Sequence, residues 1–354
     1  MNTLQETILS IGKIDGRQAG TLARERLDQL TMPYWALGRI MDLAVDLAQM
    51  TGRCPPPVAR KNIVVMAADH GVTEENTSKY PREVTAQMVH NFVAGGAGIN
   101  ALAGQVGAGV VVVDMGVDAP LDGIVGKQKI LSHKIGPGTG NMARGPAMPR
   151  GDAIKSIEVG IEIARQLDGS TDIFGTGDMG IGNTTPSSAI VSVLCDVSVD
   201  RVTGRGTGLD NDQLAHKKAV VKQALQTNHP DATDPIDVLA KVGGFEIGGI
   251  AGVILGAASL GKPVVVDGFI STAGALIAKH LAKDSVKFMI AAHKSVEPGH
   301  KIALDHLGLR PLLDLELRLG EGTGAALAMN LIDASYAVLT EIATFEEAEV
   351  SQAG

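Results

Sequence analysis

Aromatic residues are scarce in this chain of 354 residues, where Phe, Trp and Tyr together make up 3% of the sequence. Hydrophobic residues nevertheless account for 45%, so the core must be built mainly from aliphatic side chains. The length suggests one large domain, or a large domain with a small one. Glycine is abundant, with 44 residues, as expected where the backbone passes close to a ligand or a neighbouring helix.

Cysteine, basic charge and long apolar runs are also in short supply. Cys54 and Cys195 are too few for a disulfide framework or a cysteine metal site, and we interpret them as buried side chains in a reducing compartment. The net charge of −8 and the lack of a long basic run argue against nucleic-acid binding. The longest uncharged apolar run, 247–260, is shorter than the ~20 residues of a membrane span. We therefore expect a cytoplasmic protein with no membrane span, in which 247–260 is a buried helix.

The order of sequence patterns predicts an α/β fold. Apolar residues recur at helical spacing in the first 50 residues. Five short β-branched runs follow, and segments of helical pattern such as 153–167 and 273–282 lie among them. The runs are 62–71, 109–116, 171–180, 262–269 and 286–295. Runs that are apolar on both faces are typical of strands buried between helix layers, so we predict an open, doubly wound, mostly parallel sheet that is Rossmann-like.

Polar residues follow the predicted strands at the end where such sheets bind ligands. They are Asp69, His70, Asp114, Asp178, Asp267 and residues 293–295. We expect these side chains to converge on one site. An Asp-His pair by itself is more often part of a hydrogen-bonded loop than a ligand set, so we predict no metal and no cofactor.

The glycine-rich segment 175–186 has two interpretations. Its three glycines match G-x-G-x-x-G, which suggests an NAD-dependent dehydrogenase, although the motif alone is weak and lies in mid-chain. Thr185 then resembles a helix N-cap, with Pro186 at the first helical position. Free N–H groups there, with Asn183 and Thr184, suit a phosphate or a ribose. An ordinary capped helix explains the segment equally well.

A second glycine cluster, 203–210, contains Arg205 and Thr207. Successive backbone N–H groups can surround an anion, and Arg205 and Lys217 would add positive charge. A solvated turn is the alternative.

Glu321 stands between two glycines in "LRLGEGTGAALAMN", just before an alanine-rich segment. A carboxylate there can complement the positive end of the following helix. It can equally act as a general base, exposed on a bare loop at the mouth of a site. Its position does not choose between the two.

Seven motifs, taken together and in order, resemble the nicotinate-nucleotide–dimethylbenzimidazole phosphoribosyltransferase family. They are "ADHGV", "EVTAQM", "GDMGIGNTTP", "GRGTGLD", "VVVDGFISTAGAL", "EPGH" and "LGEGTGAALA". The likeness extends from about residue 5 to residue 345.

This resemblance implies a reaction and an architecture. Nicotinate mononucleotide and 5,6-dimethylbenzimidazole would give α-ribazole 5′-phosphate and nicotinate, with inversion at the ribose C1′. The fold would be a large parallel α/β domain with a small helical domain made from both chain ends, assembled as a homodimer. We expect residues 1–60 and 311–354 in the small domain and 61–310 in the large one.

The resemblance also assigns roles to residues. Glu321 would be the general base, and Asp178 a second acid where family members commonly carry Glu. Residues expected at the nucleotide are Gly180, Gly182, Asn183, Thr184, Arg205, Gly206, Lys217 and Ser295. Residues expected at the benzimidazole are Pro81, Gln87, Met88 and Leu319.

Two alternatives to this reaction stay open besides the dehydrogenase. One is transfer to another base or to a phenolic acceptor. The other is a subunit that binds nucleotides without catalysis, against which the presence of Glu321 argues.

Overall fold

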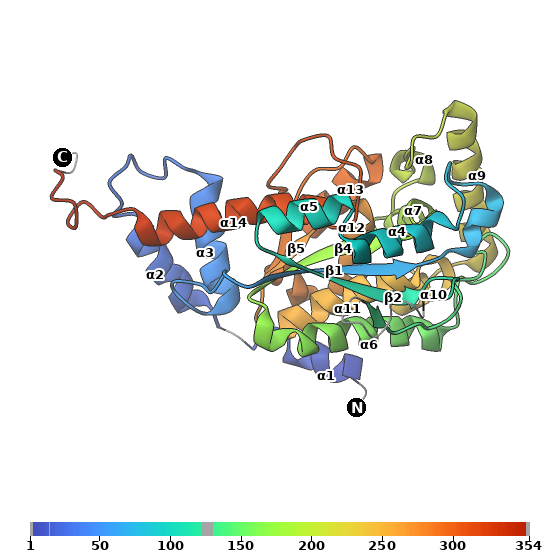
Figure 1. Cartoon of the computed structure of the whole chain (residues 1–354), viewed down its shortest axis with the longest axis horizontal. Helices are drawn as coiled ribbons and strands as arrows, with labels where there is room; N and C mark the ends of the chain where they lie inside the picture. The colour runs from blue at the N-terminus through green and yellow to red at the C-terminus, as the bar shows by residue number, and fades with distance from the viewer. Residues whose placement is uncertain (1–2, 14, 122–129, 352–354) are drawn as a thin grey trace.

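The computed structural model describes residues 3–13, 15–121 and 130–351 (Figure 1). In these residues a parallel sheet of six strands has the order β3-β2-β1-β4-β5-β6. The strands are β1 (Lys61–Ala68), β2 (Gly109–Gly116), β3 (Leu131–Ser132), β4 (Ile173–Met179), β5 (Val264–Val266) and β6 (Met289–Ala291). This is the strand order of the Rossmann fold, whose direction of winding reverses between β1 and β4. The predicted fold class is confirmed, and the short β3 was not predicted.

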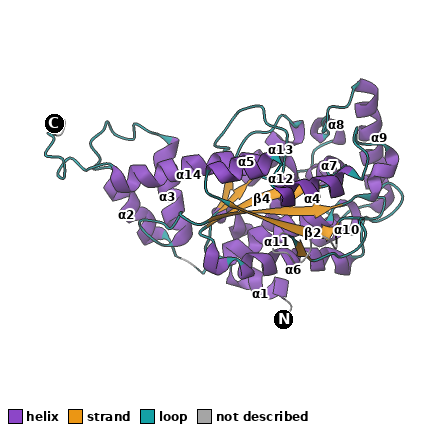
Figure 2. Cartoon of the chain, in the orientation of Figure 1, coloured by secondary structure: helices purple, strands orange, loops and turns teal. Residues whose placement is uncertain are grey.

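Helices connect the strands and cover both faces of the sheet (Figure 2). The α-helices are α1 (Thr3–Ser10), α2 (Arg17–Leu27), α3 (Arg39–Thr51), α4 (Val84–Ala94), α5 (Gly98–Gln105), α6 (Arg150–Gln166), α7 (Thr184–Leu194), α8 (Val199–Val202), α9 (Asn211–Asn228), α10 (Pro235–Val242), α11 (Phe245–Ser259), α12 (Phe269–Leu281), α13 (Pro298–Leu307) and α14 (Thr323–Glu341). Short 3-10 helices are η1 (Gly71–Glu75), η2 (Asp168–Ser170) and η3 (Lys283–Phe288).

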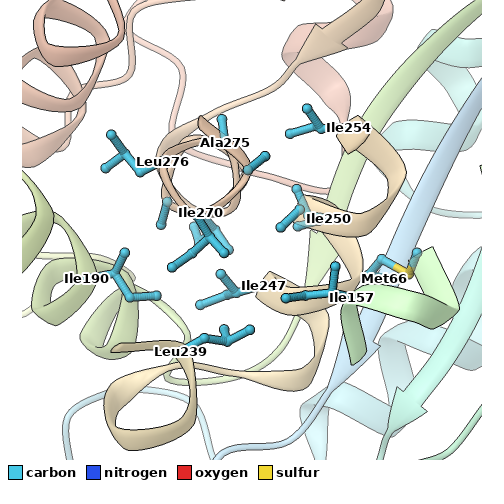
Figure 3. Close-up of a cluster of buried hydrophobic side chains, with 14 of the residues drawn as sticks. Met66, Ile157, Ile190, Leu239, Ile247, Ile250, Ile254, Ile270, Ala275 and Leu276 are labelled. Atoms are coloured by element: carbon cyan, nitrogen blue, oxygen red, sulfur yellow. The ribbon is translucent and has the colours of Figure 1, made fainter. Parts of the chain in front are cut away.

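Strand β1 shows how the two helix layers are specified. Val64 and Met66 belong to the core under α6, α11 and α12, whereas Ile63 and Val65 belong to the core under α4, α5 and α14. Successive side chains of a strand point to opposite faces, so an unbroken apolar run supplies both cores at once. Figure 3 shows the first core, where Ile157 of α6 lies near Ile247 and Ile250 of α11.

The chain ends form a smaller helical body at one side of the sheet (Figure 1). Residues of α2, α3 and the last turns of α14 share a separate core, and Leu30 and Thr344 pair as an isolated antiparallel bridge. Helix α1 instead packs on α6, with Leu4 in the large core. A helical body from both chain ends was predicted; its boundaries at residues 60 and 310 remain a prediction.

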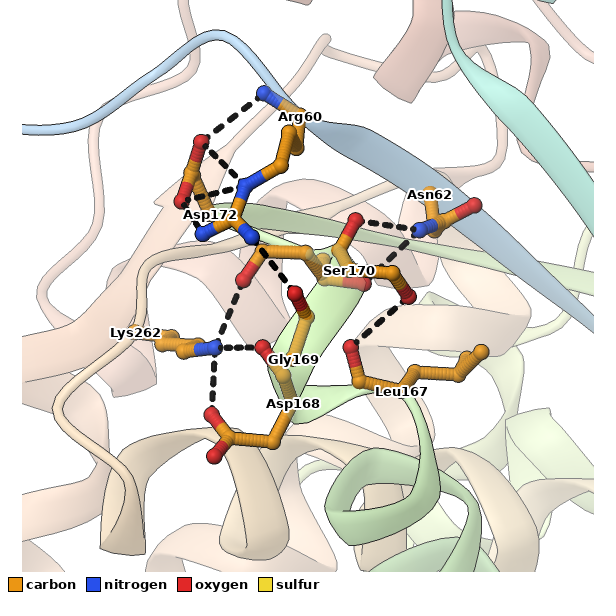
Figure 4. Close-up of polar contacts among 9 residues, drawn as sticks. Arg60, Asn62, Leu167, Asp168, Gly169, Ser170, Asp172 and Lys262 are labelled. Carbon is orange, nitrogen blue, oxygen red and sulfur yellow. Dashed lines mark hydrogen bonds and ion pairs between the residues drawn. The ribbon is translucent and has the colours of Figure 1, made fainter.

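Charged side chains at the amino ends of the strands bond to one another and to the backbone (Figure 4). Arg60 bonds the Asp172 carboxylate through its backbone N–H at 2.9 Å and through its guanidinium at 2.6 Å. Burial opposes ionisation of Asp172, but these bonds from Arg60 prevail and lower the pKa of its carboxyl. Lys262 donates to the backbone oxygens of Asp168 and Thr171. The charged groups at the amino ends of the strands therefore stabilise the fold.

Within the described residues, no helix is both long and apolar enough to cross a membrane. The predicted buried helix at 247–260 is confirmed as α11, whose residues 245–258 are all buried. It crosses α6 closely enough that a Cβ at Gly160 would lie 2.0 Å from the Gly249 oxygen, and one at Gly252 would lie 2.0 Å from the Ile157 oxygen. The glycines are there because backbone meets backbone.

We expect Gly160→Ala to lower the free energy of unfolding by about 1–3 kcal/mol, because its methyl group would overlap the α11 backbone. Gly151→Ala, in the same helix, is the control, since a Cβ there meets nothing within 4 Å. Urea denaturation of both variants measures the difference. Equal stability of the two would refute the close-packing explanation.

Candidate active site

A cavity of about 460 Å³ opens at the carboxyl ends of β4, β5 and β6, beside the point where the sheet reverses its winding. Nine of the predicted site residues line it: Met88, Asp178, Gly180, Asn183, Thr184, Gly206, Ser295, Leu319 and Glu321. His293, from the loop after β6, also lines it. Of the polar residues predicted to converge, Asp178, His293 and Ser295 line the cavity. The others lie outside its lining: Asp69, His70, Asp114, Asp267 and Lys294.

Five predicted residues lie outside the lining of this cavity: Pro81, Gln87, Gly182, Arg205 and Lys217. Pro81 and Gln87 are exposed, and Tyr80 and Val84 line the cavity from the same segment. Lys217 is fully buried behind the wall, where its Nζ donates to Thr184 Oγ1 at 2.7 Å. Burial lowers the pKa of Lys217 to about 8.

The Arg205 guanidinium is engaged by its own loop. It donates to the Leu209 oxygen at 2.7 Å and to Asn211 Oδ1 at 2.6 Å, and it lines a neighbouring cavity of about 610 Å³. Arg318 lines both cavities and forms no ion pair with the described residues. The sequence analysis assigns no role to Arg318, which stands three residues before Glu321 in "LRLGEGTGAALAMN".

Helix α7 begins two residues earlier than predicted. Asn183 is its N-cap and Thr184 its first residue, so the assignment of Thr185 as N-cap is wrong. Gly182 adopts the left-handed conformation, with φ 90°, and turns the chain into the helix there. Pro186 is tolerated in the first turn because an N–H has no intrahelical partner at that position.

The glycines of G-x-G-x-x-G serve internal packing. A Cβ at Gly177 would lie 2.4 Å from the backbone oxygen of Glu321, and one at Gly180 would lie 2.5 Å from the backbone oxygen of Ala68. Gly175 faces Ile63 and Met329 in the core. These contacts account for the motif without a dinucleotide.

Asp178 is a buried carboxyl on the cavity wall. Its Oδ2 accepts a hydrogen bond from Asn183 Nδ2 at 3.0 Å, and its Oδ1 has no partner among the described residues. Burial, followed by the negative charge of Asp267, raises the pKa of Asp178 well above its ordinary value. Burial thus makes the Asp178 carboxyl harder to ionise than an exposed one.

The Glu321 loop is tightly constrained. Gly320, Glu321 and Gly322 all have positive φ, of 82°, 62° and 92°, a conformation that costs a side-chain-bearing residue energy. Asp267, just after β5, holds the loop: its Oδ2 accepts from the Gly322 N–H at 3.2 Å and its Oδ1 from the Ala325 N–H at 3.0 Å.

The Glu321 side chain caps a helix, but a different one from α14. Its Oε2 accepts a hydrogen bond from the Ile99 N–H, in the first turn of α5, at 3.1 Å. Burial raises the pKa of the Glu321 carboxyl, the bond from Ile99 lowers it, and the net direction is upward. A carboxylate with a raised pKa in a cavity is suited to accept a proton.

Glu297 holds the glycine cluster 203–210 through a hydrogen bond to its backbone. Its Oε1 accepts from the Gly206 N–H at 2.8 Å, and its side chain lines both cavities. Glu297 is the first residue of the motif "EPGH", and the sequence analysis assigns it no role.

Comparison with known proteins identifies the family. Residues 13–350 match the family DBI_PRT, described as phosphoribosyltransferase. A protein of Syntrophotalea carbinolica named nicotinate-nucleotide–dimethylbenzimidazole phosphoribosyltransferase is 58% identical over 352 residues, 99% of each chain. A protein of that name from Desulforudis audaxviator is 55% identical, over 100% of this chain and 99% of its own. The chain belongs to this family.

A solved structure shares the architecture of this chain over nearly its whole length. The crystal structure of CobT from Thermus thermophilus superposes with a TM-score of 0.91 at 45% identity, covering 95% of this chain and 100% of that chain. The resemblance drawn from the seven motifs is confirmed, and the chain is an enzyme, a phosphoribosyltransferase.

We expect Asp267→Asn to lower the free energy of unfolding by about 1–3 kcal/mol, because the amide nitrogen would face a backbone N–H at either position. Guanidinium denaturation tests this, with Asp305→Asn, an exposed carboxylate paired to Lys301, as control. An unchanged midpoint for Asp267→Asn would mean that the loop is held by other contacts.

Proposed function

We propose that this enzyme transfers the 5-phosphoribosyl group of nicotinate mononucleotide to 5,6-dimethylbenzimidazole, giving α-ribazole 5′-phosphate and nicotinate. Relatives covering nearly the full chain carry the name of this reaction. The observation that supports it most directly is a buried carboxylate, Glu321, on the wall of a cavity lined by both apolar and polar side chains.

The chemistry needs one proton acceptor. A benzimidazole nitrogen attacks C1′ from the face opposite nicotinate, so the configuration inverts. The C1′–N bond breaks with its electron pair on the pyridine nitrogen, which neutralises the ring and needs no acid. The other benzimidazole nitrogen then carries an acidic N–H, and Glu321 takes this proton.

Asp178 is suited to the positive charge of the reacting nucleotide. Burial opposes its ionisation, and a cationic pyridinium or a ribose that develops positive charge beside it would favour its ionised form. Its Oδ1, which has no partner among the described residues, is free to accept a hydrogen bond.

The polar residues of the lining suit the phosphate and ribose. They include Thr184, Gly206 and Ser295, and the Lys217 ammonium lies directly behind the Thr184 hydroxyl. Arg318 adds an exposed cation at the junction of the two cavities. We assign the phosphate to these residues.

The apolar residues of the lining suit a flat aromatic base. They include Met88, Leu319, Tyr80 and Val84, and Leu319 lies near Glu321, since both approach Gly98. A benzimidazole between these side chains would present its N–H to the carboxylate.

We also propose a homodimer in the cytoplasm. Large apolar side chains are exposed on the small helical body, at Leu22, Tyr34 and Leu37, and at the cavity itself, at Leu319. Exposed apolar patches of this kind are typical of subunit contacts.

The test incubates the enzyme with nicotinate mononucleotide and 5,6-dimethylbenzimidazole and identifies the products by mass. We expect nicotinate and α-ribazole 5′-phosphate. Glu321→Gln should lower kcat by about 10²–10⁴-fold, the contribution of a general base, while the nucleotide still binds; Asp178→Asn should lower it less.

Other outcomes point to the alternatives. Normal turnover by Glu321→Gln would remove the general-base role. Nucleotide binding without turnover would indicate a different acceptor or a binding-only subunit, and an O-glycoside formed from a phenol would identify a phenolic acceptor.

The two arginines make a separate prediction about the phosphate. Arg318→Ala should raise the KM for the nucleotide about tenfold or more, the loss of one charge-assisted hydrogen bond. Arg205→Ala should raise it less, because its guanidinium is already bonded to Leu209 and Asn211. The KM for dimethylbenzimidazole serves as the internal reference. A larger effect of Arg205→Ala than of Arg318→Ala would indicate that the phosphate binds at the glycine cluster 203–210 instead.

A further inference from the structure

Helix α5 begins without a cap of its own. Its N-cap residue, Ala97, has no side-chain oxygen, whereas helices usually begin with Ser, Thr, Asn or Asp to accept the first free N–H groups. The Asn100 side chain accepts from the Ala97 N–H at 3.1 Å. The Ile99 N–H is left for a partner from elsewhere, and that partner is Glu321, 222 residues further along the chain.

The sequence at the start of α5 leaves room for this contact. A Cβ at Gly98 would lie 3.0 Å from Leu319 Cδ2 and 3.4 Å from Glu321 Oε2. A side chain longer than a methyl group at position 98 would enter the space that the Glu321 carboxylate occupies. Gly104, on the same helix, has open space around its Cα.

Glu321 is thus fixed at both ends. Asp267 holds its backbone through Gly322, and the first turn of α5 holds one oxygen of its side chain. With Oε2 bonded to Ile99, Oε1 of this cavity-lining residue remains to accept a proton.

We propose that the amino terminus of α5, through the Ile99 N–H and the space at Gly98, positions the Glu321 carboxylate for proton transfer. These two residues are positioning residues, with no contact to substrate required. The inference rests on the proposed role of Glu321 as general base.

The same contact sets the acidity of the base. A hydrogen bond from an N–H stabilises the carboxylate form, so its loss should raise the pKa of Glu321. Among the described residues, the other charged or titratable groups that line the cavity with Glu321 are Tyr80 before α4, Asp178 from β4, His293 and Glu297 after β6, and Arg318 on its own loop. Asp267 after β5 holds the Glu321 loop. None of these is altered by a change in α5.

The first experiment compares Gly98→Val with Gly104→Val, which add the same side chain to the same helix. Gly98→Val should lower kcat at least about tenfold, with the nucleotide KM changed less than about twofold, and should move the acid limb of the kcat/KM profile to higher pH. Gly104→Val should keep wild-type kinetics, because its side chain points into open space.

The second variant, Ala97→Ser, supplies a hydroxyl at the N-cap that competes with Glu321 for the free N–H groups. The melting temperature should stay the same or rise, since the helix gains a cap. The acid limb should nevertheless move up by about one pH unit, the effect of losing a hydrogen bond to a charged group.

The outcomes separate this inference from the proposed function. If Glu321→Gln abolishes turnover while Gly98→Val and Ala97→Ser keep the wild-type kcat and pH profile, the positioning role is overturned. If Gly98→Val lowers kcat but leaves the acid limb of the kcat/KM profile unchanged, the new side chain only obstructs the cavity, and the positioning role is overturned as well. If Gly98→Val fails to fold, a wild-type profile for Ala97→Ser is decisive against it. Turnover by Glu321→Gln would instead refute the general-base proposal.

Discussion

The Asp267 carboxylate joins the sheet to the loop on which the proposed chemistry depends. It follows β5 directly, and its two oxygens accept the Gly322 and Ala325 N–H groups at the start of α14. Because both oxygens are used, the loop is fixed in direction as well as in distance. Glu321 can therefore be held in a conformation that an unsupported loop would abandon, with three successive positive φ angles.

The acids at this edge are crowded, and the crowding has a chemical consequence. Asp178, Asp267 and Glu321 each have a raised pKa, in every case first through burial, and the charge of Asp267 adds to the rise at the other two. Burial and mutual repulsion oppose the ionisation of these carboxyls, and a bound cation would favour it. A nucleotide with a positively charged ring is a ligand of that kind. The carboxylates at the amino edge, Asp172 with Arg60 and Asp168 with Lys262, are instead paired with cations of the chain itself.

The sequence predicted what depends on local pattern and missed what depends on where side chains point. The β-branched runs became strands because they supply both cores at once, and glycine-rich α11 was recognisable as a buried helix. The two-residue β3 has too little pattern to detect. Arg205 had the right neighbours for an anion site, but its guanidinium turns back to Leu209 and Asn211. Arg318 carried no such signal, because only the folded loop places it at both cavities.

Glu321 shows why a motif can support two interpretations at once. The sequence suggests that Glu321 stabilises α14, the helix that follows it directly. Its carboxylate instead bonds to α5, which is distant in sequence and whose N-cap residue has no side-chain acceptor. The resting position of the carboxylate therefore satisfies a backbone N–H that would otherwise be buried without a partner. If Glu321 served only to stabilise the fold, its carboxylate would not need to line the cavity. If it served only as a base, it would not need to accept a hydrogen bond from the first turn of α5. Because one oxygen serves each purpose, the bond that stabilises α5 also keeps the proposed base in place between turnovers.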